Sequence, residues 1–594
     1  MQPIAGLAGR LFQEIGVFET AQLPLLVAAV LLAIAFPRLG GRAFARFEAA
    51  IEAIALRPWA SGLLLGALLL AGHVVIALTV GAPRPIIPDE ASLLLQSDTL
   101  AHGRLANPGP LPDDFSAIYV LIRPAYASIY PVLRSFPLTV GQLIGGGPWI
   151  GVWLSMLALC LAVYGMLRQV VRPGYALVGA LLVAGRWGLF SYWANSYWGG
   201  AFTALGGVLL VTGYLKLDRR SSFGAACLLG AGVFILMTTR PYEGLAFAAA
   251  FAAGLGVRAL KAERGERSGY LAAGIVALAW VFAGFALTAA HDWAVTGDWK
   301  LAPYSLYRRT VADVPAFWMQ SAAIRPPSAY FGVAHFIDYE REAFARFATL
   351  KGGLNAEKER LIGLWNFYVG WAMLAPFAIG CWRLRRWPVL AAAGALLGAA
   401  LVIETWDWTH YAAPGFALVV IAITLGLERL RAIEFAGRPI GVALSRLLPL
   451  CLGVGLLLPA EATVSGVPDF SPGLYDPFSE ACCWLRTHSA RAEVQDYLAA
   501  RPGRHLVIVD SGPRWPSHQL VVFNQADPGA AKIVWVNKDA RLNPATIAAF
   551  PARAVWRLDW RDNGSPCLTR AGSGDVVSPP APDQACLSLS SHGG

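Results

Sequence analysis

Charged residues are scarce in this sequence. Asp, Glu, Lys and Arg make up 14% of its 594 residues, while 56% of the residues are hydrophobic and fall in many long runs. Soluble proteins carry roughly a quarter charged residues, so the composition predicts an α-helical polytopic membrane protein. The net charge of +10 is typical of basic cytoplasmic loops in such a protein. No basic stripe interleaved with aromatic residues indicates a nucleic-acid partner.

Several catalytic signatures are also missing. The chain has no Gly-x-x-x-x-Gly-Lys-Ser/Thr phosphate loop, no Gly-x-Ser-x-Gly elbow, no His-Glu-x-x-His and no Asp-x-Asp. A soluble nucleotide substrate, a serine hydrolase mechanism and a zincin site are therefore unsupported. No Asp or Glu falls in the middle of a predicted span, where proton-coupled transporters usually need one.

About twelve apolar runs are long enough to cross a bilayer, at roughly 17–22 residues each. They centre near Ala29, Leu69, Ala158, Leu182, Val208, Ala231, Ala250, Trp280, Phe377, Gly394, Val419 and Val454. Arg and Lys gather in alternate loops, at residues 38–57, 168–172, 216–220, 258–267, 383–386 and 429–438. By the positive-inside rule these loops are cytoplasmic and the amino terminus is outside.

The spans define the first two predicted parts of the chain. Residues 1–58 hold an amino-terminal span followed by an amphipathic helix on the cytoplasmic interface, at residues 43–54. The first apolar run has its arginines after it, unlike a signal peptide, and is predicted to be retained. Residues 59–460 form the transmembrane module, with long extracytoplasmic loops at 82–148 and 291–361.

The third part, the tail at residues 461–594, has no span and is predicted to be a small extracytoplasmic α/β domain. Its residues 543–550 fit a short helix with Asn543 as the cap. Buried strands are expected at residues 505–509, 532–536 and 554–558.

The eight cysteines divide into two groups of four. Those in apolar runs are expected to be inert packing residues, namely Cys160, Cys227, Cys381 and Cys451. The others lie in the tail, at Cys482, Cys483, Cys567 and Cys586. An extracytoplasmic tail allows a disulfide such as Cys567–Cys586, but the sequence leaves the pairing open.

The sharpest candidate for chemistry is the pair Asp89-Glu90, just beyond a span that ends near Val80. Asp89 is expected either to cap the helical pattern of residues 91–102, which ends at Gly103, or to act as a general base. Glu90 would then complement the helix dipole or assist the base. The two interpretations are compatible, because a capped helix is a rigid mount for a base.

Weaker acidic candidates follow in the same loop. Asp98 and His102 share a helix face and favour a surface ion pair. Asp113-Asp114 would bind a cation or form a solvated loop, and the solvated loop is favoured.

Three more motifs fall in the predicted extracytoplasmic loops. The first, at residues 191–200, would line a sugar pocket, clasp a lipid chain or simply form an interfacial aromatic belt; its candidates are Tyr192, Trp193, Asn195, Tyr197 and Trp198. In the second, Arg240 would pair with Glu243 or neutralise a lipid phosphate, next to Tyr242. The third, at residues 404–411, offers its acids and His410 for an acceptor or a metal, although a lone His is more often structural.

These residues resemble the GT-C superfamily of membrane glycosyltransferases, in the branch with protein O-mannosyltransferases and the aminoarabinose transferase of lipid A. The resemblance rests on Asp89-Glu90 in an extracytoplasmic loop after a span, the amphipathic helix before it, and many further spans. The segments at residues 126–131, 192–200, 240–244 and 524–527 also look like a bacterial GT-C-like group without a settled function. Here the Asp-Glu loop follows the second span, not the first.

The resemblance implies an inverting glycosyltransferase that moves a sugar from a polyprenyl-phosphate donor to an extracytoplasmic glycan, lipid or protein acceptor. Asp89 would be the base, assisted by Glu90, and Arg240 with Arg123 would stabilise the departing phosphate. Asp89 and Glu90 would also hold a divalent cation, Mg or Mn, if one is used. The implied location is the bacterial inner membrane, with the active site and the tail in the periplasm.

Two other functions stay open on the sequence alone. A transporter or flippase of a lipid-linked or polar solute fits the number of spans. A non-catalytic envelope scaffold would use the tail to recruit a partner.

Overall fold

The computed structural model describes residues 17–38, 40–79, 81–323, 325–464, 490–512, 521–560 and 566–571. The chain forms two compact units. Unit 1 comprises Met1–Pro83, Trp149–Phe285 and Leu350–Leu485, and unit 2 comprises Arg84–Pro148, Ala286–Thr349 and Arg486–Gly594. This division differs from the expected one, because the two long loops group with the tail rather than with the transmembrane module.

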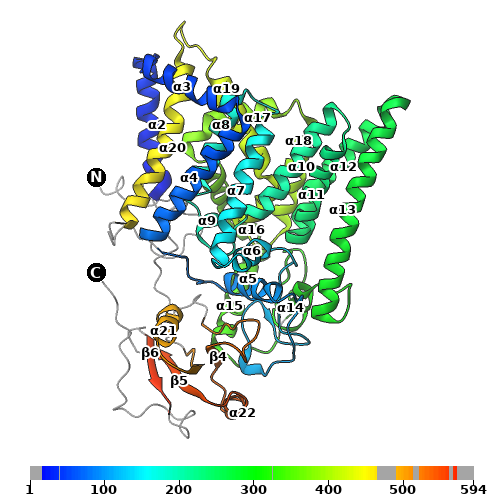
Figure 1. Cartoon of the computed structure of the whole chain (residues 1–594), viewed down its shortest axis with the longest axis vertical. Helices are drawn as coiled ribbons and strands as arrows, with labels where there is room; N and C mark the ends of the chain where they lie inside the picture. The colour runs from blue at the N-terminus through cyan, green and yellow to red at the C-terminus, as the bar shows by residue number, and fades with distance from the viewer. Residues whose placement is uncertain are drawn as a thin grey trace. The chain divides into compact units, whose positions relative to one another are not determined.

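Unit 1 is helical (Figure 1). Its amino-terminal helices are α2 (Val17–Ala35), α3 (Gly41–Ala55) and α4 (Pro58–Thr79). The middle segment contributes α7 (Pro148–Leu167), α8 (Pro173–Arg186), α9 (Tyr192–Asn195), α10 (Ala201–Arg219), α11 (Phe223–Thr239), α12 (Pro241–Lys261) and most of α13 (Arg264–Thr296). The last segment contributes α16 (Leu350–Tyr368), η3 (Trp371–Met373), α17 (Leu374–Leu384), α18 (Pro388–Ile403), η4 (Thr409–Gly415), α19 (Phe416–Leu430) and α20 (Ile440–Val464).

The predicted fold class is confirmed, with fewer full-length spans than expected. Within the described residues, seven helices are long and apolar enough to cross a membrane, or up to eight if one bent pair is a single span. That pair is α16 with the segment Trp371–Leu384, bent by 74°. All twelve predicted span centres fall in helices, but several are short, such as α8 with 14 residues. Hydropathy therefore located the helices but overestimated the length of some.

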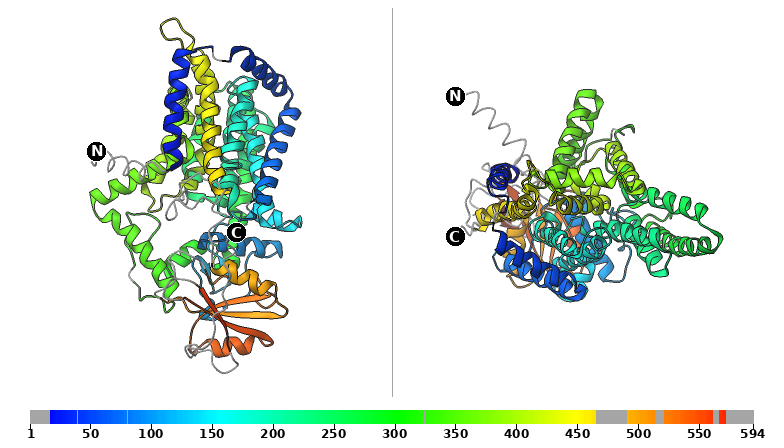
Figure 2. Two further views of the ribbon diagram at one scale, coloured as in Figure 1. Left: turned by 90° about the vertical axis from the view of Figure 1, so that its left-hand side faces the viewer. Right: turned by 90° about the horizontal axis from the view of Figure 1, so that it is seen from above.

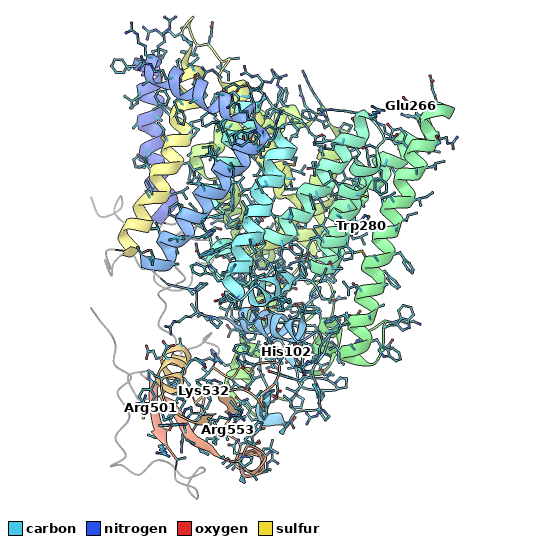
Figure 3. All side chains as sticks on the ribbon, viewed as in Figure 1. His102, Glu266, Trp280, Arg501, Lys532 and Arg553 are labelled. Atoms are coloured by element: carbon cyan, nitrogen blue, oxygen red, sulfur yellow. The ribbon has the colours of Figure 1, made fainter. Side chains whose placement is uncertain are left out.

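Helix α13 presents the most exposed apolar surface among these helices, since only 11% of its apolar window is buried. Its labelled Trp280 (Figure 3) meets Phe234 of α11 edge-on, with ring centroids 5.6 Å apart. Leu271, Leu278 and Phe282 are exposed on the same helix. Such a surface suits a lipid environment.

Unit 2 combines a loop region with a sheet region. The loop region holds α5 (Pro88–Ala101), η1 (Asp113–Phe115), β1 (Val120–Leu121), β2 (Ala127–Ser128), α6 (Phe136–Leu143), α14 (Pro303–Thr310), α15 (Phe331–Ala345) and η2 (Arg346–Ala348). The sheet region holds α21 (Ala490–Ala499), β3 (Arg504–Val509), β4 (Ile533–Asn537), α22 (Asn543–Ala549), β5 (Arg553–Trp560) and β6 (Pro566–Arg570). The three predicted strands correspond to β3, β4 and β5.

The sheet has the order β4-β3-β5-β6, with β3 parallel to β4 and β5, and β6 antiparallel to β5 (Figure 2). Because strand side chains alternate, Val507 and Val509 face one core with α21, and Leu506 and Ile508 face another with Phe115. The sheet is therefore covered on both faces, as the continuous apolar strands indicate.

Two expectations in unit 2 are wrong. Asn543 does not cap α22: Leu542 is the N-cap residue, and the Asn543 side chain instead donates to Asp114 Oδ2 at 3.1 Å. Asp114 is not solvated but fully buried, and its Oδ2 also accepts from Thr546 at 2.6 Å. Burial raises the pKa of Asp114. The sequence could not show this, because the partners lie more than 400 residues away.

Of the tail cysteines, Cys567 on β6 is disulfide-bonded. Cys482, Cys483 and Cys586 lie outside the described residues, so the pairing with Cys586 stays a prediction.

Candidate functional site

The Asp-Glu pair lies in the first turn of α5, whose N-cap residue is Ile87. Glu90 Oε2 accepts hydrogen bonds from the backbone N–H groups of Ile86 at 2.9 Å and Ile87 at 3.4 Å. The Glu90 side chain thus reaches back to satisfy donors that an α-helix leaves open at its start. Glu90 is 1% exposed, so it fixes the start of α5. The capping that the sequence assigned to Asp89 belongs to Glu90.

Asp89, one position earlier, is only half-buried, and its carboxylate faces a tyrosine. The hydroxyl of Tyr130 donates to Asp89 Oδ1. Tyr130 is itself held in place, because Gln96 of α5 donates to its backbone carbonyl at 2.9 Å. The guanidinium of Arg134 lies 5.2 Å from the Tyr130 ring centroid. Asp89 is therefore an ordered, partly accessible carboxylate on a fixed helix.

A second polar group in unit 2 centres on Tyr119. Its hydroxyl donates to Glu340 Oε1 at 3.0 Å, and Arg308 donates to Glu340 Oε2 at 2.9 Å. The rings of Tyr119 and Tyr130 meet edge-on, 6.1 Å apart. Burial raises the pKa of Tyr119, and the charges of Glu340 and Asp89 raise it further. Asp89 thus lies within electrostatic reach of the Tyr119 hydroxyl.

Tyr119 also has a backbone φ of 60°, which is uncommon for a residue with a side chain. Such conformations persist where the surroundings hold them, often at functional sites. The Tyr119 carbonyl accepts from Ser92 at 2.6 Å, and its N–H donates to the Tyr307 hydroxyl at 3.3 Å. These contacts hold Tyr119 in position beside Tyr130.

Four other sequence candidates of unit 2 lie in ion pairs. Arg123 pairs with Asp113, and both side chains are about half exposed. His102 Nδ1 lies 3.5 Å from Asp98 Oδ1, the pair that the helical spacing predicts. Asp98 has a further role, since its Oδ2 accepts from the backbone N–H of Ala526 at 2.7 Å.

The main polar cluster of unit 1 surrounds Arg240, at the junction of α11 and α12. Arg240 pairs with Glu243 at 2.8 Å. This pair is one of the two alternatives that the sequence offered for Arg240, the other being a lipid phosphate. Its guanidinium also lies 3.7 Å from the ring centroid of Tyr411. The side chains of Arg240 and Glu243 are 13% and 4% exposed. Desolvation opposes the charge of Arg240, but Glu243, Tyr411 and Glu404 outweigh it and raise the Arg240 pKa.

Glu404 is the unusual member of this cluster. It is buried, and its Oε2 has no hydrogen-bond partner among the described residues. Burial raises the pKa of Glu404 well above its ordinary value, and the negative charge of Glu243 adds to the effect. Arg360 donates to the backbone carbonyl of Glu404 at 2.6 Å. The carboxyl groups of Glu243 and Glu404 therefore both interact electrostatically with Arg240, and only Glu243 forms an ion pair with it.

Part of the aromatic loop of unit 1 meets the His410 segment. The hydroxyl of Tyr192 lies 2.8 Å from Thr409 Oγ1 and 3.2 Å from His410 Nδ1. The ring of Trp198 packs edge-on against His410, with centroids 5.0 Å apart. The structure thus brings together Tyr192, Trp198 and His410, which the sequence proposed separately. Burial raises the pKa of Tyr192 to about 12, so its hydroxyl stays neutral at physiological pH.

The other candidates of unit 1 make packing or backbone contacts. Trp193 is buried against Phe367, with ring centroids 5.1 Å apart. Asn195 donates to the carbonyl of Leu189 at 2.7 Å and so shapes its own loop. The remaining tyrosines donate to backbone carbonyls, Tyr197 to Pro83 at 2.8 Å and Tyr242 to Ala400 at 3.2 Å.

Metal binding finds limited support. No group of three or more His, Cys, Asp and Glu side chains gathers in a metal-binding arrangement within the described part of the chain. Mg²⁺ favours carboxylate oxygens and retains several waters, so a single carboxylate such as Asp89 is a suitable ligand. Glu90 is less suitable, because its Oε2 already accepts hydrogen bonds from two backbone N–H groups. The divalent cation stays a prediction.

No family model and no curated protein matches this chain. Among solved structures, ArnT from Cupriavidus metallidurans in the apo state matches 84% of this chain and 93% of its own, with 11% identity and a TM-score of 0.47.

A second similar structure is the archaeal oligosaccharyltransferase AglB from Archaeoglobus fulgidus, in complex with an inhibitory peptide and a dolichol-phosphate. It has 12% identity and a TM-score of 0.40, and the match covers 79% of this chain. The chain spans 65% of that enzyme's length, just under two thirds.

Proposed function

We propose that this protein is an integral-membrane inverting glycosyltransferase. It transfers a sugar from a polyprenyl-phosphate donor to an extracytoplasmic acceptor hydroxyl on a glycan, lipid or protein. The observation that carries the proposal is the environment of Asp89: a partly accessible carboxylate that faces the Tyr130 hydroxyl, on a helix whose start Glu90 fixes. A general base needs this combination of access and fixed position.

In the proposed reaction, Asp89 accepts the proton of the acceptor hydroxyl as its oxygen attacks the anomeric carbon. The new carbon–oxygen bond forms on the face opposite the phosphate, and the bond from the anomeric carbon to the phosphate oxygen breaks. The electron pair leaves with polyprenyl phosphate, so the anomeric configuration inverts. General-base catalysis of this kind contributes roughly 10²–10⁴-fold in rate.

The departing phosphate needs positive charge, and Arg240 is the proposed residue of unit 1 for this role. Its pairing with Glu243 leaves a guanidinium whose fork geometry suits phosphate oxygens. The raised pKa of Glu404 supports this role, because it favours the neutral form, which places no negative charge beside Arg240. Arg123, exposed and paired with Asp113 in unit 2, is the weaker candidate.

The disulfide at Cys567 supports an extracytoplasmic tail, because disulfides persist in oxidising compartments such as the bacterial periplasm. We propose that the active site and the tail lie on the periplasmic face of the inner membrane.

The proposal is tested with purified protein in liposomes, supplied with a radiolabelled polyprenyl-phosphate hexose and total envelope lipid, glycan and protein fractions as acceptors. Label should move into an acceptor fraction, and the product should have the opposite anomeric configuration to the donor. Movement of intact donor across the bilayer without transfer would instead identify a flippase. Retention of configuration would overturn the single-step mechanism.

A further inference from the structure

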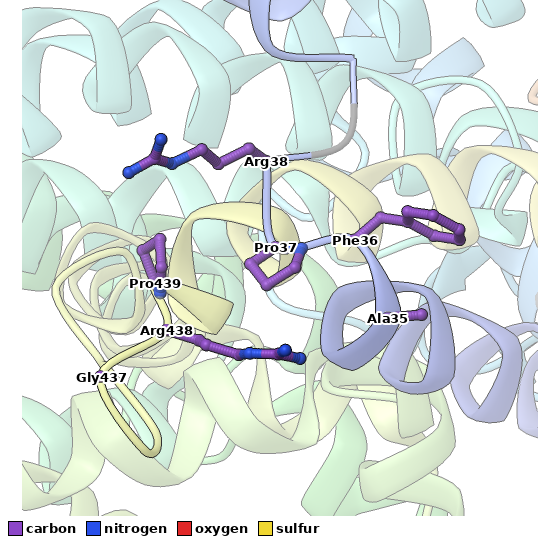
Figure 4. A pocket seen from close by; sticks show the side chains of 7 residues that line it. All are labelled: Ala35, Phe36, Pro37, Arg38, Gly437, Arg438 and Pro439. Carbon is purple, nitrogen blue, oxygen red and sulfur yellow. The ribbon is translucent and has the colours of Figure 1, made fainter.

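Unit 1 has a surface hollow where the carboxyl end of α2 meets the amino end of α20. It has a volume of about 580 Å³ and is lined by the turn after α2 and the hairpin before α20. Among its lining residues, labelled in Figure 4, Arg38 lies in the turn and Arg438 lies in the hairpin. We call it the α2–α20 hollow.

The hollow carries an excess of positive charge. Arg438 donates to the carbonyl of Ile34 in the last turn of α2 at 3.3 Å, and both Arg38 and Arg438 are exposed. Neither forms an ion pair within the described part of the chain. Glu48 of α3 is already bound by Arg431 at 2.7 Å and by Arg446 at 2.8 Å.

One further acid, Glu434, lies in the hairpin before α20 and is exposed. A single exposed carboxylate does not balance two arginines, so the hollow retains a net positive charge. Two arginines line the hollow, and a guanidinium binds phosphate oxygens in a bidentate manner.

The surface next to the hollow is apolar. On α2, Leu31 is 61% and Ile34 is 47% exposed, and Phe36 at the rim is 57% exposed. On α20, Leu450 and Leu457 are 51% and 60% exposed. The two helices lie side by side in both side views (Figures 1 and 2). A ligand that fits has a charged end for the hollow and apolar chains for the helices.

We propose that the α2–α20 hollow binds the anionic headgroup of a membrane phospholipid, with its acyl chains along α2 and α20. Arg38 and Arg438 hold the headgroup phosphate. Basic hollows between membrane helices commonly recognise anionic lipid headgroups in this manner. The site is independent of Asp89 and of the proposed transfer reaction, and none of its residues is a candidate for that chemistry.

The experiment titrates the purified full-length protein in detergent with phosphatidylglycerol and measures bound lipid by native mass spectrometry. Wild-type protein should bind phosphatidylglycerol more tightly than phosphatidylcholine. The double variant Arg38→Gln/Arg438→Gln should bind phosphatidylglycerol about 25-fold more weakly, since each arginine contributes about fivefold. The matched control is Arg220→Gln/Arg267→Gln, which removes two exposed arginines of unit 1 outside the hollow and should bind within about twofold of wild type.

Three results would overturn the proposal. Equal losses in the double variant and its control would show only diffuse charge attraction. Displacement of the lipid by millimolar inorganic phosphate would show that the hollow takes a free anion rather than a lipid. Unchanged binding by Arg38→Gln alone, which leaves the Arg438–Ile34 contact intact, would remove Arg38 from the site even if the double variant unfolds.

Discussion

The hydroxyl of Tyr130 donates a hydrogen bond to Oδ1 of Asp89, across 41 residues of sequence. This bond orients the carboxylate and stabilises its ionised form, which is the form that accepts a proton. Glu90 reinforces the arrangement from the other side by fixing the first turn of α5. In this group Glu90 is buried, whereas Asp89 and Tyr130 are partly exposed.

The first prediction concerns Tyr130→Phe. Loss of the hydroxyl removes a hydrogen-bond donor from the Asp89 carboxylate, so the transfer rate should fall by about tenfold. This loss is smaller than the one expected when the base itself is removed. The acidic limb of the pH–rate profile should also move to higher pH, because a carboxylate without a donor is protonated more easily. Steady-state kinetics across pH measures both effects. A slower enzyme with an unchanged pH profile would mean that Tyr130 only packs.

The second prediction separates Glu90 from catalysis. Glu90→Ala removes the acceptor of the Ile86 and Ile87 N–H groups and should destabilise the protein by about 1–2 kcal/mol. Glu90→Gln retains an acceptor oxygen, so its loss of stability should be smaller. Thermal unfolding in detergent measures the difference. A Glu90→Gln protein with full stability and no transfer activity would show that Glu90 takes part in the chemistry.

The third prediction tests how the Ala526 loop is held within unit 2. Asp98→Ala leaves the Ala526 N–H without its acceptor, which costs about 1–2 kcal/mol and should speed hydrogen exchange of that amide by about tenfold or more. The control is Asp496→Ala, whose side chain is 61% exposed in a surface pair with Arg84. Exposed ion pairs contribute little to stability, so hydrogen exchange of the Ala526 amide should be unchanged in Asp496→Ala. Equal effects in both variants would contradict the assignment.

The fourth prediction follows from the raised pKa of Glu404. Its folded pKa lies above the ordinary value of 4.5, so the neutral form is favoured in the folded state. The stability it contributes is complete below pH 4.5 and is lost as pH rises toward the folded pKa. Glu404→Gln stays neutral, so its melting temperature should fall less than that of wild type over this window.

Infrared spectroscopy gives an independent measure of the same property. Above pH 4.5, wild-type protein should show more carboxylic-acid carbonyl absorption than Glu404→Gln, and the difference spectrum isolates the contribution of Glu404 from that of the other acids. The control Glu434→Gln changes an exposed acid and should retain the contribution of Glu404. Identical absorption in wild type and Glu404→Gln would contradict the raised pKa of Glu404.

Local features of the fold were predictable from the sequence. Hydropathy placed every span centre in a helix, and the helical pattern of residues 91–102 corresponds to α5. Gly103, expected to end that helix, has a φ of 70°, which suits glycine. β6 was not predicted, because it begins with a proline and depends on its pairing with β5.

The site was predictable only in part, for the same reason. Asp89 and the Arg240–Glu243 pair follow from neighbours in sequence. Tyr119 meets Glu340 across 221 residues, and no local pattern connects them. The resemblance drew attention to the segment that contains Tyr130, but its bond to Asp89 needed the fold.

The most direct test of the central claim is the single-turnover rate at which polyprenyl phosphate is released from a sugar donor in the presence of acceptor. Asp89→Asn keeps the shape of the side chain but cannot accept the proton at physiological pH, so the rate should fall by about 10²–10⁴-fold, with the melting temperature of wild type. Asp496→Asn, an exposed acid of the same unit, should react at the wild-type rate. Release by Asp89→Asn at the wild-type rate would contradict the account.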